Sequence, residues 1–144
     1  MLQEDVTPCF CMGLGLLFVI GDMFMSATKQ LRQLAAQLPR VIDAIEGELK
    51  TVSHRMEVLQ KAGLIYASEH WRESKYLYLI YPMRDGNRRR EYIGADANRI
   101  TEARAGIGRG KEFDQLSAKL KELNARINNS VAALKEAVRQ LGSW

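Results

Sequence analysis

The longest pattern in the chain is a repeat of apolar residues at alternating steps of three and four positions. It consists of Leu31, Leu34, Leu38, Val41 or Ile42, Ile45, Leu49, Val52, Met56 and Leu59. Charged and other polar residues occupy most positions between them, as on the solvated side of an amphipathic helix. The spacing is typical of a coiled-coil seam. We therefore predict a helix over residues 28–63, kinked or restarted near Pro39 and ended by Gly63.

A second repeat of the same kind lies near the C-terminus. It consists of Phe113, Leu116, Leu120, Leu123, Ile127, Val131, Leu134, Val138 and Leu141. This repeat predicts a helix over residues 111–141. A short helix over residues 96–106, capped by Asp96, precedes it, and Gly106, Gly108 and Gly110 are expected to separate the two. Because neither long helix is apolar enough to be stable alone, we expect the two seams to pair within one chain or between chains.

Between the repeats, the sequence has the composition of β-strands. Residues 64–68, 76–82 and 89–93 are three short runs rich in β-branched, aromatic and other apolar residues, which predict an antiparallel meander over residues 64–95. The turn before the third run is type I′ if Asp85-Gly86 is central and type II′ if Gly86-Asn87 is central. In either register, one face carries Leu77, Leu79 and Tyr81 with Arg88, Arg90 and Tyr92, and the other carries Tyr76, Tyr78 and Ile80 with Arg89, Glu91 and Ile93.

Together these elements predict a single α+β domain over residues 28–144. Its order is a long N-terminal helix, a three-stranded meander, a short helix and a long C-terminal helix, with coiled-coil-like pairing and a dimer or higher oligomer. Residues 1–27 form an apolar N-terminal extension without Lys or Arg. Its apolar run, residues 9–20, is shorter than the ~20 residues that span a bilayer, and its acidic flank does not suit a signal peptide. We expect a cytoplasmic protein without membrane contact.

Positive charge is concentrated in one region of this 144-residue chain. Residues 84–111 contain eight basic and four acidic residues, a surplus equal to the net charge of +4 of the whole chain. Arginine binds phosphate, and tyrosine stacks on unpaired bases. The candidate nucleic-acid or phosphate-binding residues are Arg84, Arg88, Arg89, Arg90, Tyr81, Tyr92, Arg99, Arg104, Arg109 and Lys111. A solvated charged surface is the alternative interpretation of the same pattern.

The glycine-rich segment 105–111 has two interpretations. At the start of a helix its free amides would attract an anion, with Arg109 and Lys111 beside them. It is not a Walker A loop, because Ala105 replaces the first glycine and Glu112 replaces the Ser or Thr. A flexible joint between two helices is the other interpretation.

The sequence offers little for catalysis or metal binding. His54 and His70 have no nucleophile motif beside them, and the carboxylates fall among Lys and Arg on helix faces. Cys9 and Cys11, the only cysteines, form half of a metal site at most. We expect no enzymatic activity, cofactor or metal.

Two parts of the sequence resemble known proteins. The segment 51–79 is similar to the recognition helix and wing of arsenic-repressor-type winged-helix proteins, through Ser53, His54, Leu59, Ala62, Gly63, Leu64, Tyr76 and Tyr78. That resemblance implies that Thr51, Ser53, His54 and Arg55 face DNA. Residues 75–127 resemble small uncharacterised proteins of transposons and phages, through Tyr76, Tyr78, Asp85, Gly86, Arg88 to Arg90, Tyr92, Leu116, Leu120 and Leu123. That resemblance implies a protein of a phage or mobile element.

The function that we predict from these observations is non-enzymatic binding of nucleic acid through the basic Tyr/Arg hairpin. One alternative is a phage anti-defence protein that sequesters a signalling nucleotide or inhibits a host defence protein. Another is a coiled-coil scaffold for oligomerisation.

Overall fold

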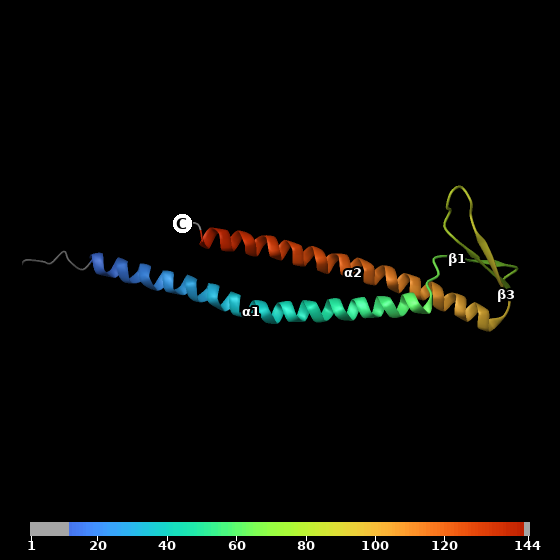
Figure 1. Ribbon diagram of the computed structural model, residues 1–144, viewed down its shortest axis with the longest axis horizontal. Coiled ribbons are helices and arrows are strands. Elements are labelled where there is room, and N and C mark those ends of the chain that lie inside the picture. The colour runs from blue at the N-terminus through green and yellow to red at the C-terminus, as the bar shows by residue number, and fades with distance from the viewer. Residues whose placement is uncertain (1–11, 143–144) are drawn as a thin grey trace, which may run out of the picture. The chain divides into compact units, whose positions relative to one another are not determined.

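The computed structural model describes the backbone of residues 12–142 and the side chains of residues 26–142. The elements follow the order α1 (Met12–Ala62), β1 (Ser68–Arg72), β2 (Tyr76–Ile80), β3 (Arg90–Gly94) and α2 (Ala97–Leu141) (Figure 1). This order confirms the predicted α+β layout, in which a three-stranded antiparallel sheet lies between two long helices along the sequence. The chain divides into two compact units within α1, between Ala44 and Ile45.

Helix α1 begins earlier than predicted. It starts at Met12, inside the expected extension 1–27, and it contains Pro39 without ending, so the helix does not restart there. Its end agrees with the prediction. Gly63 has a φ of +90°, a conformation that favours glycine, and its N–H donates to the carbonyl of Gln60 at 3.2 Å. Cys9 and Cys11 lie outside the described residues.

Helix α2 is continuous, so the predicted short helix and glycine joint are wrong. Gly106 and Gly110 are buried within it, and the segment after α1 crosses the helix there. The N–H of Ile65 donates to the carbonyl of Gly106 at 3.1 Å. A Cβ on Gly106 would lie 2.5 Å from Cδ1 of Ile65, and one on Gly110 would lie 2.9 Å from the carbonyl oxygen of Ile65. These two glycines therefore permit close packing and do not break the helix.

The first strand is also displaced from its predicted position. Residues 64–67 form no strand, and β1 is Ser68–Arg72, which pairs with β2 with Trp71 opposite Leu77 and His70 opposite Tyr78. The apolar residues of 64–67 are used for packing on α2, where Ile65 and Ala67 contact the core. Residues 64–67 therefore pack against α2 and do not pair as a strand.

The core of the second unit lies between one face of the sheet and the start of α2. Leu77 and Leu79 of β2 are fully buried and pack with Ile93 of β3 and with Ala103 and Ile107 of α2. Each buried leucine contributes about 2 kcal/mol to stability through the hydrophobic effect.

The part of α1 that belongs to the second unit, residues 45–62, lies antiparallel to α2. Lys119 pairs with Glu48 at 2.6 Å and Arg55 pairs with Glu112 at 2.7 Å, so the residue number falls along α1 as it rises along α2. The seam residues Val52, Leu59 and Leu123 are buried. The coiled-coil-like pairing of the two seams is therefore present in this unit.

The turn of the β2–β3 hairpin is type I′, one of the two types that the sequence allowed. Asp85 and Gly86 both have positive φ, +50° and +77°, as this turn requires. The N–H of Arg84 donates to the carbonyl of Asn87 at 3.0 Å, and the N–H of Asn87 donates back to Arg84 at 2.9 Å. The two-residue loop thus closes as the sequence indicates.

A bulge separates this turn from the sheet. The N–H of Tyr81 donates to the carbonyl of Arg89, so Pro82 and Met83 on one strand oppose Arg88 alone on the other. Proline has no amide to donate to a strand ladder, and such positions are typical of bulges. The extra residue shifts the register by one, which exchanges the faces of β3 relative to β2.

The predicted sorting of side chains between the two faces is therefore wrong for β3. In the structure, the face toward α2 carries Leu77, Leu79 and Tyr81 with Ile93, Glu91 and Arg89, and the opposite face carries Tyr76, Tyr78 and Ile80 with Tyr92 and Arg90. The face toward α2 contains the buried Leu77, Leu79 and Ile93, with Glu91 and Arg89 toward the hairpin turn. The other is aromatic and basic.

Candidate nucleic-acid interface

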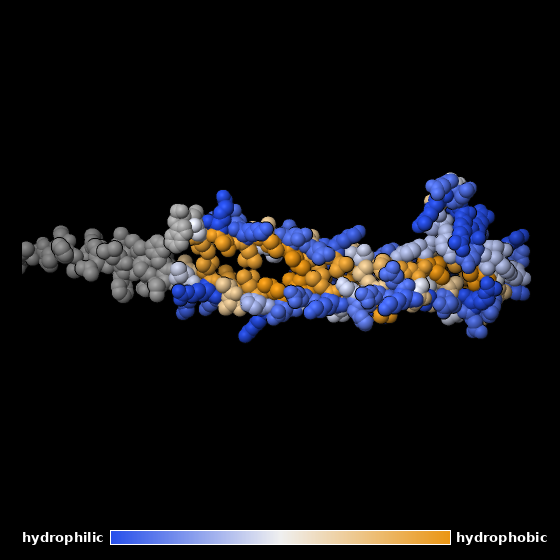
Figure 2. Space-filling model, in the orientation of Figure 1, coloured by the Kyte–Doolittle hydropathy of each residue, from blue (hydrophilic) through white to orange (hydrophobic). Residues whose placement is uncertain are grey.

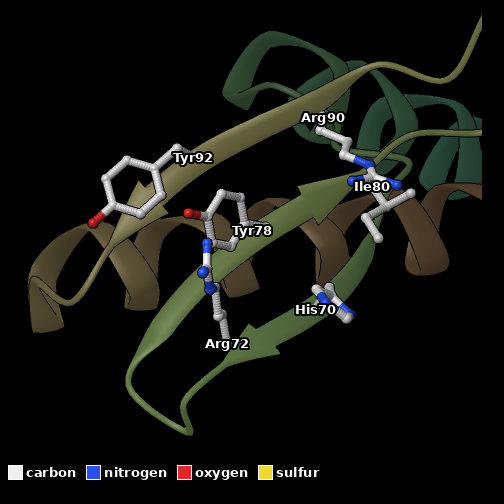
Figure 3. A pocket seen from close by; sticks show the side chains of 6 residues that line it. All are labelled: His70, Arg72, Tyr78, Ile80, Arg90 and Tyr92. Carbon is white, nitrogen blue, oxygen red and sulfur yellow. The ribbon is translucent and has the colours of Figure 1, made fainter.

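The outer face of the sheet, turned away from the core, is the candidate interface. Directly paired residues of antiparallel strands share a face, which places His70 beside Tyr78, Arg72 beside Tyr76 and Arg90 beside Ile80. All of these side chains except Tyr76 line an open hollow of about 330 Å³, and Tyr92 lines it with them (Figure 3). We call the seven residues His70, Arg72, Tyr76, Tyr78, Ile80, Arg90 and Tyr92 the outer sheet face.

Three tyrosines lie together on this face. The ring centroid of Tyr92 is 5.0 Å from that of Tyr78 and 6.4 Å from that of Tyr76, and both pairs are tilted. The Tyr92 ring also lies over Gly94, where a Cβ would be 3.7 Å from it. Tyr92 nevertheless has 52% of its surface exposed. The cluster thus presents aromatic surface that is supported by the sheet and open to a ligand.

The charges of the three strands are sorted between the two faces. Both strand arginines, Arg72 and Arg90, line the outer hollow. Both strand carboxylates, Glu69 and Glu91, make their contacts with residues outside the outer sheet face. Glu73, in the β1–β2 turn, is 3.9 Å from Arg72, and the side chains of this pair are both 70% exposed. Such an exposed pair is weak and is easily displaced by a stronger anion.

Glu69 is held on the α2 side of β1. It accepts bonds from Arg104 at 3.2 Å and from the indole N–H of Trp71 at 3.2 Å, and Arg104 also lies over the Trp71 ring at 5.4 Å. The hydrogen bond from Arg104 lowers the pKa of Glu69, against the opposing effect of burial. This network keeps one negative charge away from the outer sheet face.

Glu91 is engaged in a similar way on β3. The hydroxyl of Tyr81 donates to Glu91 at 2.8 Å, and burial, followed by this bond to the carboxylate, raises the pKa of Tyr81. Arg89 lies over the Tyr81 ring at 5.1 Å and is 3.8 Å from Glu91. Tyr81 is packed against the core and is not a free stacking platform.

The structure brings only part of the predicted site together. Arg90 and Tyr92 lie on the outer sheet face. Arg84 and Arg88 lie on the exposed hairpin beyond the sheet and make no ion pair among the described residues. The surface of this hairpin is hydrophilic (Figure 2). Arg99 is exposed on the first turns of α2. The three consecutive arginines therefore do not form a single group.

The helical part of the predicted site is mostly engaged elsewhere. Arg109 donates to the carbonyl of Gly63 at 2.7 Å and to Glu102 at 2.9 Å, and Arg104 is bound to Glu69. Lys111 is exposed within α2. Because the segment 105–111 lies inside a helix, its amides are used in the helix and the predicted phosphate site at a helix N-terminus is wrong.

Sequence reasoning missed five members of the outer sheet face: His70, Arg72, Tyr76, Tyr78 and Ile80. The first two were missed because β1 was placed four residues too early, and the other three because the facial sorting overlooked the bulge. Pro82 was the available signal, since a proline near the end of a strand run indicates that regular pairing stops.

The segment that resembles a recognition helix is the end of α1. Thr51 donates to the carbonyl of Gly47, and Arg55 makes two bonds to Glu112 on α2, at 2.7 and 3.0 Å. Ser53 and His54 are exposed. These residues thus belong to a 51-residue helix and not to a separate short one.

Comparison of the chain with models of known protein families, with curated proteins and with solved structures finds no match. Neither helix, in the described part of the chain, has a stretch both long and apolar enough to cross a membrane. Among the described residues, no three His, Cys, Asp or Glu side chains are grouped so as to hold a metal ion.

Proposed function

We propose that the protein binds single-stranded nucleic acid on the outer sheet face, without catalysing a reaction on it. The observation that carries this proposal is the sorting of the strand side chains. The exposed Tyr92, the half-buried Tyr76 and Tyr78 and both strand arginines lie on one face, and both strand carboxylates make their contacts away from it. This separation leaves the aromatic and basic groups of one face available to a ligand that carries both bases and phosphates.

The arrangement matches what single-stranded nucleic acid requires. Every base has a π-face, so stacking on Tyr92 and Tyr78 would be tolerant of sequence and would contribute about 1–3 kcal/mol per base. Arg72 and Arg90 lie at opposite ends of the hollow, beside Tyr76 and Ile80 respectively. Four residues of strand, roughly 13 Å, separate those two positions along β2, which suits phosphates at either side of stacked bases. In a duplex the bases already stack on one another, so the tyrosines favour unpaired bases.

The first test is titration of fluorescein-labelled single-stranded DNA and RNA, and the matching duplexes, at several salt concentrations. We expect the single strands to bind more tightly than the duplexes. For the two phosphate contacts of Arg72 and Arg90, the logarithm of the affinity should fall with the logarithm of the salt concentration with a slope of about −1.4. Equal affinity for duplex and single strand, or no dependence on salt, contradicts the proposal.

Variants identify the surface that binds. Tyr92→Ala should lower the affinity about 5- to 150-fold, while Tyr92→Phe, which keeps the ring, should stay within about twofold of the parent protein. Arg90→Ala should lower the affinity and make the salt slope less steep by about 0.7. Arg32→Ala on α1 is the matched control, because Arg32 is also exposed but lies far along the sequence in the other compact unit. A loss with Arg32→Ala as large as with Arg90→Ala would contradict binding at this face.

A further inference from the structure

A second hollow lies where the β2–β3 hairpin leaves the sheet. Its apolar lining comes from Leu64, Tyr66, Tyr81 and Pro82. Its polar lining comes from Arg84, Asn87 and Arg89. We call it the neck hollow. Its volume of about 380 Å³ lies within the range of roughly 300–1,000 Å³ that small-molecule sites occupy.

Each aromatic ring of the neck hollow has a carboxylate near its hydroxyl. The hydroxyl of Tyr81 donates to Glu91 at 2.8 Å, and Tyr66 lies near Asp114 on α2. Burial raises the pKa of both tyrosines, and the neighbouring carboxylates raise it further. The ring of Tyr66, a residue that is 42% exposed, is the wall open to a flat ligand, whereas Arg89 lies over the Tyr81 ring.

The two arginines of the neck hollow have guanidinium N–H donors that are free to bind an anion. Arg84 makes no ion pair among the described residues. Arg89 is stacked over Tyr81, and its 3.8 Å separation from Glu91 is too long for a hydrogen bond. Asn87 is joined to Arg84 by the two backbone bonds of the turn, which fixes these two residues relative to each other. Guanidiniums with free donors beside aromatic walls are suited to a phosphate attached to a flat ring.

We propose that the neck hollow is a separate binding site for a planar ring that carries a phosphate, the chemistry of a nucleoside monophosphate. It is separate from the outer sheet face because Arg89 and Arg90, although adjacent in sequence, line different hollows. The ligand could be a free nucleotide or the terminal nucleotide of a strand, since both present the same chemistry. The site does not depend on nucleic-acid binding by the outer sheet face.

The test is titration of the full chain with AMP, adenosine and inorganic phosphate, followed by calorimetry and by ¹H–¹⁵N NMR spectra. AMP should bind once per chain and at least about tenfold more tightly than either fragment, because ring and phosphate both contribute. The shifted amides should centre on Leu64, Arg84 and Asn87. Shifts that centre on Tyr78 and Tyr92, or AMP binding no tighter than phosphate, would overturn the proposal.

Adjacent residues provide the matched variants. Arg84→Ala, and separately Arg89→Ala, should weaken AMP binding about fivefold or more by removing a charged donor, while Arg90→Ala should leave it within about twofold. An oligonucleotide without a terminal phosphate should show the opposite pattern, with loss for Arg90→Ala and little change for Arg84→Ala. If Arg90→Ala weakens AMP as much as Arg84→Ala does, the two hollows are not separate sites and the proposal fails.

The outcomes for the two sites can be told apart. Loss of the oligonucleotide response alone rejects the function proposed for the outer sheet face, and loss of the AMP response alone rejects the neck hollow.

To compare terminal and free nucleotides, the oligonucleotide is also measured with a 5′-phosphate. A gain in affinity that Arg84→Ala abolishes would support capture of a strand terminus, and no gain would support the free nucleotide as the ligand. Circular dichroism of each variant confirms that it is folded.

Discussion

The glycines of α2 provide a sharp test of the packing that places the hairpin. In a helix, replacement of glycine by alanine on an open surface stabilises by about 1 kcal/mol, because the backbone of the unfolded chain loses freedom. Gly108 meets this condition, since a Cβ there has no neighbour within 4 Å. Gly110 does not, because its Cβ would lie 2.9 Å from the carbonyl oxygen of Ile65 and 3.3 Å from Cε1 of Tyr66.

The expected effects of the two substitutions have opposite signs. Gly108→Ala should raise the free energy of unfolding by about 1 kcal/mol. Gly110→Ala gains the same helix propensity but must displace a backbone segment, and overpacking of this kind costs about 1–3 kcal/mol. The displacement also weakens the bond from Ile65 to the carbonyl of Gly106, worth about 1 kcal/mol. The net result should be a loss of about 1–3 kcal/mol, so the two variants differ by about 2–4 kcal/mol.

Urea denaturation followed by circular dichroism and by tryptophan fluorescence measures this difference, and Trp71 of β1 contributes to the fluorescence. Gly106→Ala provides a second check, because its clash is with the side chain of Ile65. Ile65→Ala should relieve that clash, so the two substitutions should be less destabilising together than the sum of their separate effects. If Gly110→Ala stabilises as much as Gly108→Ala does, the segment after α1 does not pack on this face of α2.

Two further predictions concern the capping and the ion pairs of the second unit. Asp96→Ala should lower the free energy of unfolding by about 1 kcal/mol, because Asp96 accepts a bond from the N–H of Asn98 at 3.0 Å at the start of α2; urea denaturation measures it, and an unchanged midpoint would contradict the cap. Stability should also fall as the pH is lowered from about 5 toward 3. The hydrogen bond from Arg104 lowers the pKa of Glu69 in the folded protein, so the unfolded chain binds more protons there and the stabilisation is lost as the pH falls through the folded value. Glu69→Gln should reduce this dependence on pH more than Glu57→Gln, whose carboxylate makes no ion pair among the described residues; equal effects would show that the Glu69 network does not contribute.

The order of the elements could be predicted because each signal is local. The leucine repeats specify the two long helices, and Asp85-Gly86 specifies the turn through the positive φ that both positions require. Gly63 similarly ends α1 through its own conformation. None of these depends on a contact with a distant segment.

The errors arose where a distant contact decides the structure. Glycines at 106 and 110 indicate a break when considered alone, and only the passage of Ile65 over them explains a continuous helix. The same passage uses residues 64–67 for packing and moves β1 toward the C-terminus. These contacts join residues about forty positions apart, and the spacing of apolar residues along the sequence does not predict such contacts.

The candidate site changed for a more local reason. A single extra residue at Pro82 and Met83 moves Arg90 and Tyr92 onto the same face as Tyr78. The expected cluster of three arginines is thereby divided, and Arg89 lines the neck hollow while Arg90 lines the outer sheet face. The residue types of the site were thus recognised from the sequence. Their grouping was not, because both predicted turn types gave the same sorting of side chains and neither included the bulge that changes it.

Photo-crosslinking tests the proposed interface most directly. A single-stranded oligonucleotide that contains 5-iodouracil is irradiated with the full chain, and the modified peptide is identified by mass spectrometry. Stacking on the outer sheet face predicts adducts on Tyr92 or Tyr78, and their loss when salt is raised or when Arg90 is replaced by alanine. Adducts confined to other residues, or adduct formation that is unchanged in Tyr92→Ala and Tyr78→Ala variants, would contradict nucleic-acid binding at this face.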